Sequence, residues 1–322
     1  MHRSNVRAAG DQGWRALSLD VARPRRAGLQ VQVTGRGQLL VVQDGEVVLL
    51  AQVCRFHTGA DYLRTNRFRS PVSPIRAAHA RDLVAGDTDS TLSRWAHHFA
   101  RELAATNLGP LQTGQWAIGR DAQLRAVSGA RSPAERWGEL LLTDDPDGFI
   151  DWLVHNGSGQ VLPLRRLSDV DDGRVKAYRK QAREGCLPPI LLWWISGLDC
   201  SVVLDGHDRL RAALLENQEP PMLTLQSVLV ARMQHETNDH IARYSAAVPQ
   251  IDRQIRAGIP GAAEALAAAH RGLGERVQTA AINCGRTSAW PLPGGDASWW
   301  AAVRLHSSGE FAATLRTQPY RP

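Results

Sequence analysis

The feature that most constrains the fold is a change from an apolar run to a helical pattern within the stretch Leu187–Leu225. Residues 202–204 are typical of a short buried strand, and Leu210 and Leu214 recur at helical spacing. A single glycine, Gly206, lies between the two patterns, and glycine lets the backbone turn tightly. The sequence therefore predicts a strand that passes directly into a helix at Gly206.

Such a junction is suited to bind an anion, because the first N–H groups of a helix have no helical partners and the helix dipole is positive there. Arg209, in the predicted first turn, would add a forked donor that suits phosphate. In the opposing interpretation, Asp208 caps the helix, Asp205 closes a turn and Arg209 is a solvated surface charge. The spacing alone leaves both interpretations open.

The elements around this junction follow the order of the ParB/sulfiredoxin fold, over residues from about 160 to 230. A strand with a polar turn (VLPLRRLSD) precedes a helix (DDGRVKAYRKQAREG) and two strands (LPPILLWWISG and SVVLD). The Gly-x-x-Arg helix and a last strand (PPMLTLQSVLV) follow. The motif Asp205-Gly206-His207-Asp208-Arg209 is similar to the DGHHR motif of free serine kinases, with Asp208 in place of the second histidine. It also resembles the GCHR motif of sulfiredoxins and the GERR motif of partition ParB proteins.

This resemblance implies a domain that binds a nucleoside triphosphate with Mg²⁺. Gly206, Asp208 and Arg209 would contact the phosphates. Arg174 would add charge, because it falls near a lysine that meets nucleotide phosphate in sulfiredoxins.

If the protein is an enzyme, the resemblance implies an NTP hydrolase or a kinase-like phosphotransferase, with His207 or Asp205 positioning a metal ion or an acceptor. Sulfiredoxin chemistry is not expected, because His207 occupies the place of the catalytic cysteine and Cys186 and Cys200 lie elsewhere. The alternative is that the fold is kept as a non-catalytic module that binds a partner or nucleic acid.

Outside this region, the sequence predicts a β-meander and several helices. Residues 29–53 read as three strands joined by hairpins. A helix from about Ser90 to Ala105 has one apolar face that is suited to cover the meander. Residues 246–259 and 261–281 predict two further helices joined by a Gly-Ile-Pro-Gly turn.

We therefore expect an α+β protein in four parts. Residues 1–28 would form a basic, flexible arm, and residues 29–150 an α+β domain. Residues 155–235 would form the ParB/sulfiredoxin-like domain, and residues 236–322 a mainly helical extension.

The charge distribution and the cysteine content limit the kinds of ligand and partner that we expect this protein to bind. Residues 1–36 hold seven arginines against Asp11 and Asp20, which is +5 of the net charge of +6. This arm could contact nucleic acid non-specifically or acidic lipid headgroups, with a solvated tail as the alternative. The four cysteines form no C-x-x-C pair, so neither a zinc site nor a disulfide framework is expected. Without a long apolar run or an apolar leader, we expect no membrane span and a cytoplasmic location.

Overall fold

The computed structural model describes most of the chain. The described residues are 1–7, 13–22, 26–54, 58–84, 86–120, 145–152, 161–228, 230–283, 286–307, 311–313 and 315. The boundary expected between residues 150 and 155 falls largely on residues 153–160, which lie outside the described residues.

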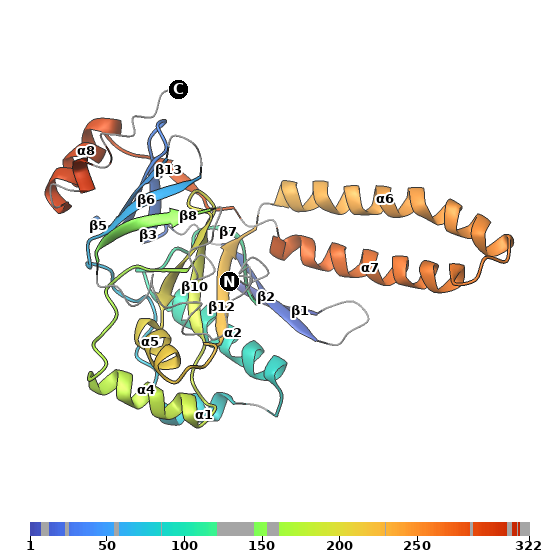
Figure 1. The fold of residues 1–322 in the computed structure, drawn as a ribbon, viewed down its shortest axis with the longest axis horizontal. Helices are drawn as coiled ribbons and strands as arrows, with labels where there is room; N and C mark the ends of the chain where they lie inside the picture. The colour runs from blue at the N-terminus through green and yellow to red at the C-terminus, as the bar shows by residue number, and fades with distance from the viewer. Residues whose placement is uncertain are drawn as a thin grey trace.

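Two mixed β-sheets form the body of the protein (Figure 1). The seven-stranded sheet has the order β1-β2-β7-β12-β10-β11-β9. Its strands, in chain order, are β1 (His2–Arg7), β2 (Trp14–Val21), β7 (Gly114–Gly119), β9 (Val161–Pro163), β10 (Ile190–Ile195), β11 (Cys200–Asp205) and β12 (Met222–Ser227).

The six-stranded sheet has the order β13-β3-β4-β5-β6-β8. Its strands are β3 (Leu29–Val33), β4 (Gln38–Gln43), β5 (Glu46–Val53), β6 (Gly59–Arg64), β8 (Asp147–Asp151) and β13 (Ala289–Pro291). β13 joins β3 in parallel, although more than two hundred residues separate the two strands in the sequence.

The described helices cover the two sheets or project from them. They are α1 (Ala77–Leu83), α2 (Thr88–Ala105), α4 (Gly173–Arg183), α5 (His207–Leu215), α6 (Val230–Arg256), α7 (Ala262–Asn283) and α8 (Gly295–His306). α4 and α5 pack against each other beside β10, and α8 lies on β4 and β5. α6 and α7 pair with each other and extend away from the body (Figure 1).

One hydrophobic core joins the two sheets. It contains Leu17 of β2, Ile118 of β7 and Leu223 of β12 together with Val41 of β4 and Leu49 of β5. A second cluster lies between α5 and the seven-stranded sheet, and a third lies under α8 on the six-stranded sheet. Because the main core crosses between the sheets, the expected parts 1–28, 29–150 and 155–235 all contribute to one packed body.

Several predicted elements are confirmed, and the molecule is a mixed α+β protein. The three strands from Leu29 are β3, β4 and β5, and the order of strand, helix, two strands, helix and strand from residue 161 is also found. α2 matches the helix expected near residues 90–105. Its place differs, however, since it lies against β2 and β7 rather than covering the meander.

The N-terminal segment differs from the flexible arm that its charge predicts. Within residues 1–28, the described residues form β1 and β2, and β2 pairs with β7 from Ala16 to Val21. Leu17 and Leu19 are fully buried, so apolar contacts rather than arginines decide the position of this segment. Arg7 and Arg15 remain exposed, and non-specific binding of nucleic acid through such residues stays a prediction.

No helix in the described ranges combines the length and the hydrophobicity that crossing a membrane requires.

Candidate phosphate-binding site

The candidate site lies where β11 passes into α5. Gly206 is the N-cap of α5 and has a φ of 101°, in the left-handed region that favours glycine. A Cβ at this position would come within 2.8 Å of the Arg209 Nη2 atom. Gly206 therefore permits both the turn and the close approach of the Arg209 guanidinium.

Arg209 is inside the protein rather than on its surface. The residue is 2% exposed, and its Nη2 atom donates to Asp205 Oδ2 at 2.6 Å and to the carbonyl oxygen of Pro189 at 3.0 Å. Its guanidinium also lies 5.9 Å from the centroid of the Tyr178 ring on α4. These contacts hold the Gly206 turn against α4 and the residue before β10, and they contradict the interpretation of Arg209 as a solvated surface charge.

Asp208 is buried and is surrounded by donors from the segment that follows β9. Its Oδ1 atom accepts a hydrogen bond from Ser168 Oγ at 2.7 Å and one from Arg165 Nη2 at 3.1 Å. Arg174 Nε lies 3.7 Å from its other oxygen. Asp208 thus holds two arginine side chains at the start of α5.

His207 is also buried, and its ring lies against Phe68 with the centroids 5.6 Å apart. Burial lowers the pKa of His207 well below its usual value, and the positive charges of Arg165, Arg209 and Arg64 lower it further. The imidazole is therefore neutral at physiological pH. Its Nε2 atom has no hydrogen-bond partner within the described structure.

A segment that follows β6 closes the site from the side of the other sheet. Ser70 Oγ donates to Asp205 Oδ1 at 2.9 Å, and Asn66 Oδ1 accepts from the backbone N–H of Arg166 at 2.7 Å. Together with the ring contact between Phe68 and His207, these hydrogen bonds connect the start of α5 and the turn after β9 to the segment that follows β6.

The structure brings the predicted residues together around one junction, but it gives them different exposures. Asp205, Gly206, His207, Asp208 and Arg209 make internal contacts, whereas the side chain of Arg174 is 66% exposed. Sequence reasoning missed Arg165, whose side chain is 28% exposed. It lies in the polar turn after the first strand of the domain. That turn is the sequence feature that could have indicated Arg165 as a site residue.

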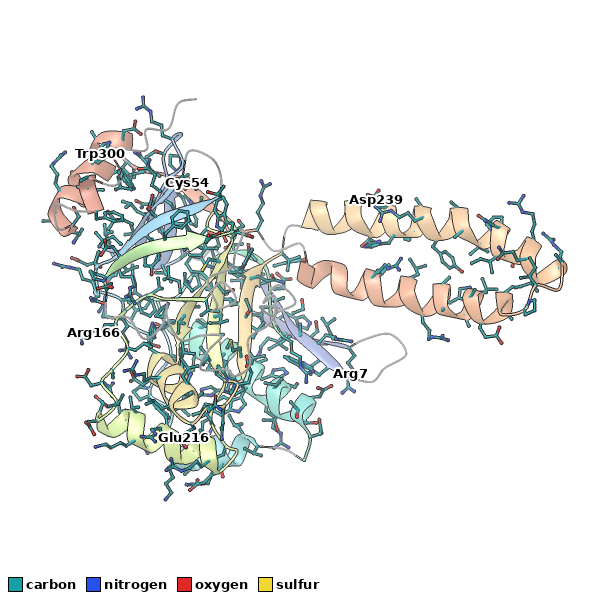
Figure 2. All side chains as sticks on the ribbon, in the orientation of Figure 1. Arg7, Cys54, Arg166, Glu216, Asp239 and Trp300 are labelled. Carbon is teal, nitrogen blue, oxygen red and sulfur yellow. The ribbon has the colours of Figure 1, made fainter. Side chains whose placement is uncertain are left out.

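The far side of this region is a structural ion-pair cluster. Glu216, labelled in Figure 2, lies at the end of α5 where α4 and α5 meet. Its Oε1 atom accepts hydrogen bonds from Arg179 and Arg183 of α4, each at 2.6 Å. These two arginines are therefore engaged in holding α4 on α5, while Arg174 lies at the opposite end of α4, nearest to Gly206.

Neither Cys186 nor Cys200 has the properties of a reactive centre. Burial raises the pKa of the Cys200 thiol strongly and that of Cys186 more modestly, which opposes formation of a reactive thiolate. In the part of the chain that the structure describes, no cluster of His, Cys, Asp or Glu side chains is arranged to hold a metal ion.

Comparisons of the chain with protein-family models, with curated proteins and with solved structures give no significant match.

Proposed function

We propose that the start of α5 binds the phosphates of a nucleoside triphosphate, within a ParB/sulfiredoxin-like domain that spans about residues 160–230. The observation that carries the proposal is the convergence of Arg165 and Arg174, both partly exposed, on the first turn of α5. A helix start with free N–H donors and two reachable guanidinium groups favours a multiply charged anion. The motif around Gly206 makes a nucleotide the preferred anion.

The arginines around the junction support an anion site. The charges that perturb His207 are all positive, and they come from Arg165, Arg209 and Arg64. Asp208 offsets part of this charge, but its carboxylate is already bound by Ser168 and Arg165. Arg174 Nε also lies 3.6 Å from Asp172 Oδ1, whose side chain is 32% exposed, so an entering phosphate would compete with this carboxylate for Arg174.

The residues present do not form a magnesium site of their own. Asp205 is engaged by Arg209 and Ser70, and Asp208 by Arg165 and Ser168. We therefore expect Mg²⁺ to enter with the nucleotide, held by phosphate oxygens and water. Because His207 is buried and Asp205 is paired, the proposal covers binding and assigns no residue to turnover.

Titration calorimetry with ATP, CTP and GTP, each with magnesium, tests the proposal. Arg174→Ala should weaken binding about tenfold or more, because hydrogen bonds to charged groups contribute roughly 1.5–3 kcal/mol. Lys176→Ala is the matched control. It removes the same charge from the same helix, at a residue that pairs with Asp171 at 3.0 Å. Equal losses in both variants, or no binding to the unsubstituted protein at millimolar nucleotide, would reject the site.

The second candidate function is a non-catalytic interaction module. It is favoured by the internal pairing of Asp205 with Arg209 and of Asp208 with Arg165, which stabilises the junction without any ligand. This candidate predicts that the three nucleotides leave the thermal unfolding midpoint unchanged, whereas a ligand that binds only the folded state raises it.

A further inference from the structure

A second concave site lies at the edge of the six-stranded sheet, where β13 pairs with β3 (Figure 1). It is an open pocket with a volume of about 910 Å³, within the roughly 300–1,000 Å³ that is usual for small-molecule sites. Trp290 and three glutamines line it, and Arg26 is the one charged side chain among the described residues of its lining. It shares no residue with the junction at Gly206.

Trp290 has no packing role in the described structure that would explain its position. The residue is half-buried, but it belongs to none of the three hydrophobic clusters, whereas Trp299 and Trp300 pack in the cluster under α8. Its indole N–H has no hydrogen-bond partner among the described residues. Since tryptophan combines a large apolar ring with one donor, Trp290 offers the pocket both a flat apolar surface and a free N–H group.

The register of the sheet places Trp290 beside two of the glutamines. Trp290 is the partner of Gln32 in the parallel pair of β13 and β3, so the two side chains lie on the same face. Gln30, two residues earlier on β3, points to that face as well. Leu29 and Val31 alternate with them and belong to the main core on the opposite face. The face away from this core therefore carries an indole and two amides in adjacent positions.

The polar groups of the pocket retain hydrogen-bonding capacity. Within the described part of the chain, the side chains of Gln32, Gln112 and Arg26 have no hydrogen-bond or ion-pair partner. Gln30 differs, because its Nε2 atom donates to the carbonyl oxygen of Ala27 at 2.6 Å, which leaves its Oε1 atom as an acceptor. A free amide can donate and accept at the same time, as a ligand with several hydroxyl groups requires.

The backbone around β13 holds Trp290 in place. The N–H of Leu292 donates to the carbonyl oxygen of Val33 at 2.9 Å, and Leu292 packs against the cluster under α8. Before the strand, the Thr287 hydroxyl donates to the carbonyl oxygen of Trp194 at 2.8 Å. Because these contacts exist without a ligand, binding at Trp290 requires little ordering of the chain.

The lining disfavours two classes of macromolecular ligand. A nucleic acid is bound mainly through several cations that neutralise its phosphates, and Arg26 alone does not supply them. A peptide that extends the sheet would pair with the short edge strand β13, but Pro291 has no backbone N–H to offer and Pro293 follows two residues later. The chemistry of the pocket instead suits a ligand with hydroxyl groups, a flat apolar face and a single type of negative group.

We propose that this pocket binds an acidic saccharide, a sugar chain that carries carboxylate groups. The C–H face of one sugar ring lies on the indole of Trp290, and the hydroxyl groups at its rim bond to the amides of Gln32 and Gln112. The guanidinium of Arg26 binds a sugar carboxylate through two parallel hydrogen bonds. This inference is independent of nucleotide binding, because the two sites have no residue in common.

Titration calorimetry of the full chain with a trimer of galacturonic acid tests the proposal, and a neutral trimer of galactose serves as the comparison. The acidic trimer should bind saturably at millimolar concentration, about tenfold more tightly than the neutral one. Arg26→Ala should remove this difference. Arg36→Ala is the matched control, because it removes the same charge from an exposed arginine outside the pocket, one that pairs with Asp296 at 3.0 Å. It should leave both affinities unchanged.

The aromatic contact is tested separately. Trp290→Ala should weaken binding of the acidic trimer about tenfold or more, whereas Trp290→Phe, which keeps an aromatic face, should weaken it less. Both variants should keep the thermal unfolding midpoint within about 4 °C, since Trp290 lies outside the hydrophobic clusters. Absence of binding to the acidic trimer at millimolar concentration overturns the proposal. Equal affinity in Trp290→Ala and the unsubstituted protein also overturns it, as does binding of oligothymidylate or a polyproline peptide in place of the trimer.

Discussion

At the scale of single residues, the start of α5 shows how burial redistributes roles among neighbouring charged groups. Sequence spacing places Arg209 in the first turn, and its fork suits phosphate. In the structure, its nearest anion is Asp205, four residues earlier, and Pro189 accepts from it as well. The reachable charge belongs instead to Arg174 and Arg165. In the structure, Arg209 therefore holds the turn, whereas Arg165 and Arg174 are accessible to a ligand.

The separation predicts that two alanine variants lose very different amounts of stability. Arg209→Ala would leave the Asp205 carboxylate, whose side chain is 13% exposed, without its cation, and breaking a largely buried pair on one side costs about 3 kcal/mol of unfolding free energy. Arg174→Ala should change this free energy by no more than about 0.5 kcal/mol, because its side chain is largely exposed. Urea denaturation of both variants measures the difference. A stable Arg209→Ala protein would show that the internal pair is not needed.

At the scale of elements, the junction between β11 and α5 depends on a backbone conformation as much as on side chains. Gly206 has a positive φ, and the Arg209 guanidinium occupies the space of the missing Cβ. Gly185, after α4, also has a positive φ, of 69°, but has open space around it. Substitution of each glycine by alanine therefore distinguishes the energetic cost of backbone strain from that of a steric clash.

Gly206→Ala should destabilise the protein by about 3 kcal/mol or more, because it adds the displacement of Arg209 to the strain of the turn. Gly185→Ala should cost only the strain of a left-handed residue, about 1–2 kcal/mol. Chemical denaturation of the two variants under the same conditions tests the difference. Equal losses would mean that Arg209 can move aside without penalty.

Some of the strands could be predicted from the sequence, and others could not. β3, β4, β5, β10 and β11 have local apolar patterns and clear turn residues, so they could be predicted. β2 could not be predicted from its sequence pattern. Ala16 and Leu17 are consecutive and both buried, which interrupts the alternation of buried and exposed residues that is typical of a strand. Its partner β7 lies about a hundred residues away in the sequence, and no local sequence pattern predicts such a pairing.

The candidate site was predictable in the same limited way. The turn at Gly206 follows from the chain around it, because strand, glycine and helix are consecutive. The hydrogen bond between Ser70 and Asp205 spans 135 residues, and the burial of Arg209 depends on Tyr178 of α4 and on Pro189, the residue before β10. Such contacts arise from tertiary packing, which spacing within one segment cannot encode.

At the scale of the whole molecule, the body and the hairpin formed by α6 and α7 are separate structural units. The chain leaves β12 at Ser227 and returns at Arg286, whose backbone N–H donates to the Ser227 carbonyl oxygen at 3.2 Å. Thr287 then bonds Trp194 and Ser196 at the end of β10. The two ends of the hairpin are therefore closed by the body itself.

We expect the body to fold without the hairpin. Replacing residues 229–285 by a short Gly/Ser linker should shift the thermal unfolding midpoint by no more than about 4 °C, the shift that roughly 1 kcal/mol causes in a domain of this size. Aggregation or loss of the cooperative transition would show that α6 and α7 support the sheets.

The closed base at Ser227 and Arg286 also makes the length of the hairpin independent of the rest of the molecule. Adding seven residues to each helix would move the tip outward by about 10 Å and keep its angular phase nearly constant. No strand would change its register as a result. Paired insertions or deletions in the two helices would therefore change the reach of the hairpin while the fold that carries it stays fixed.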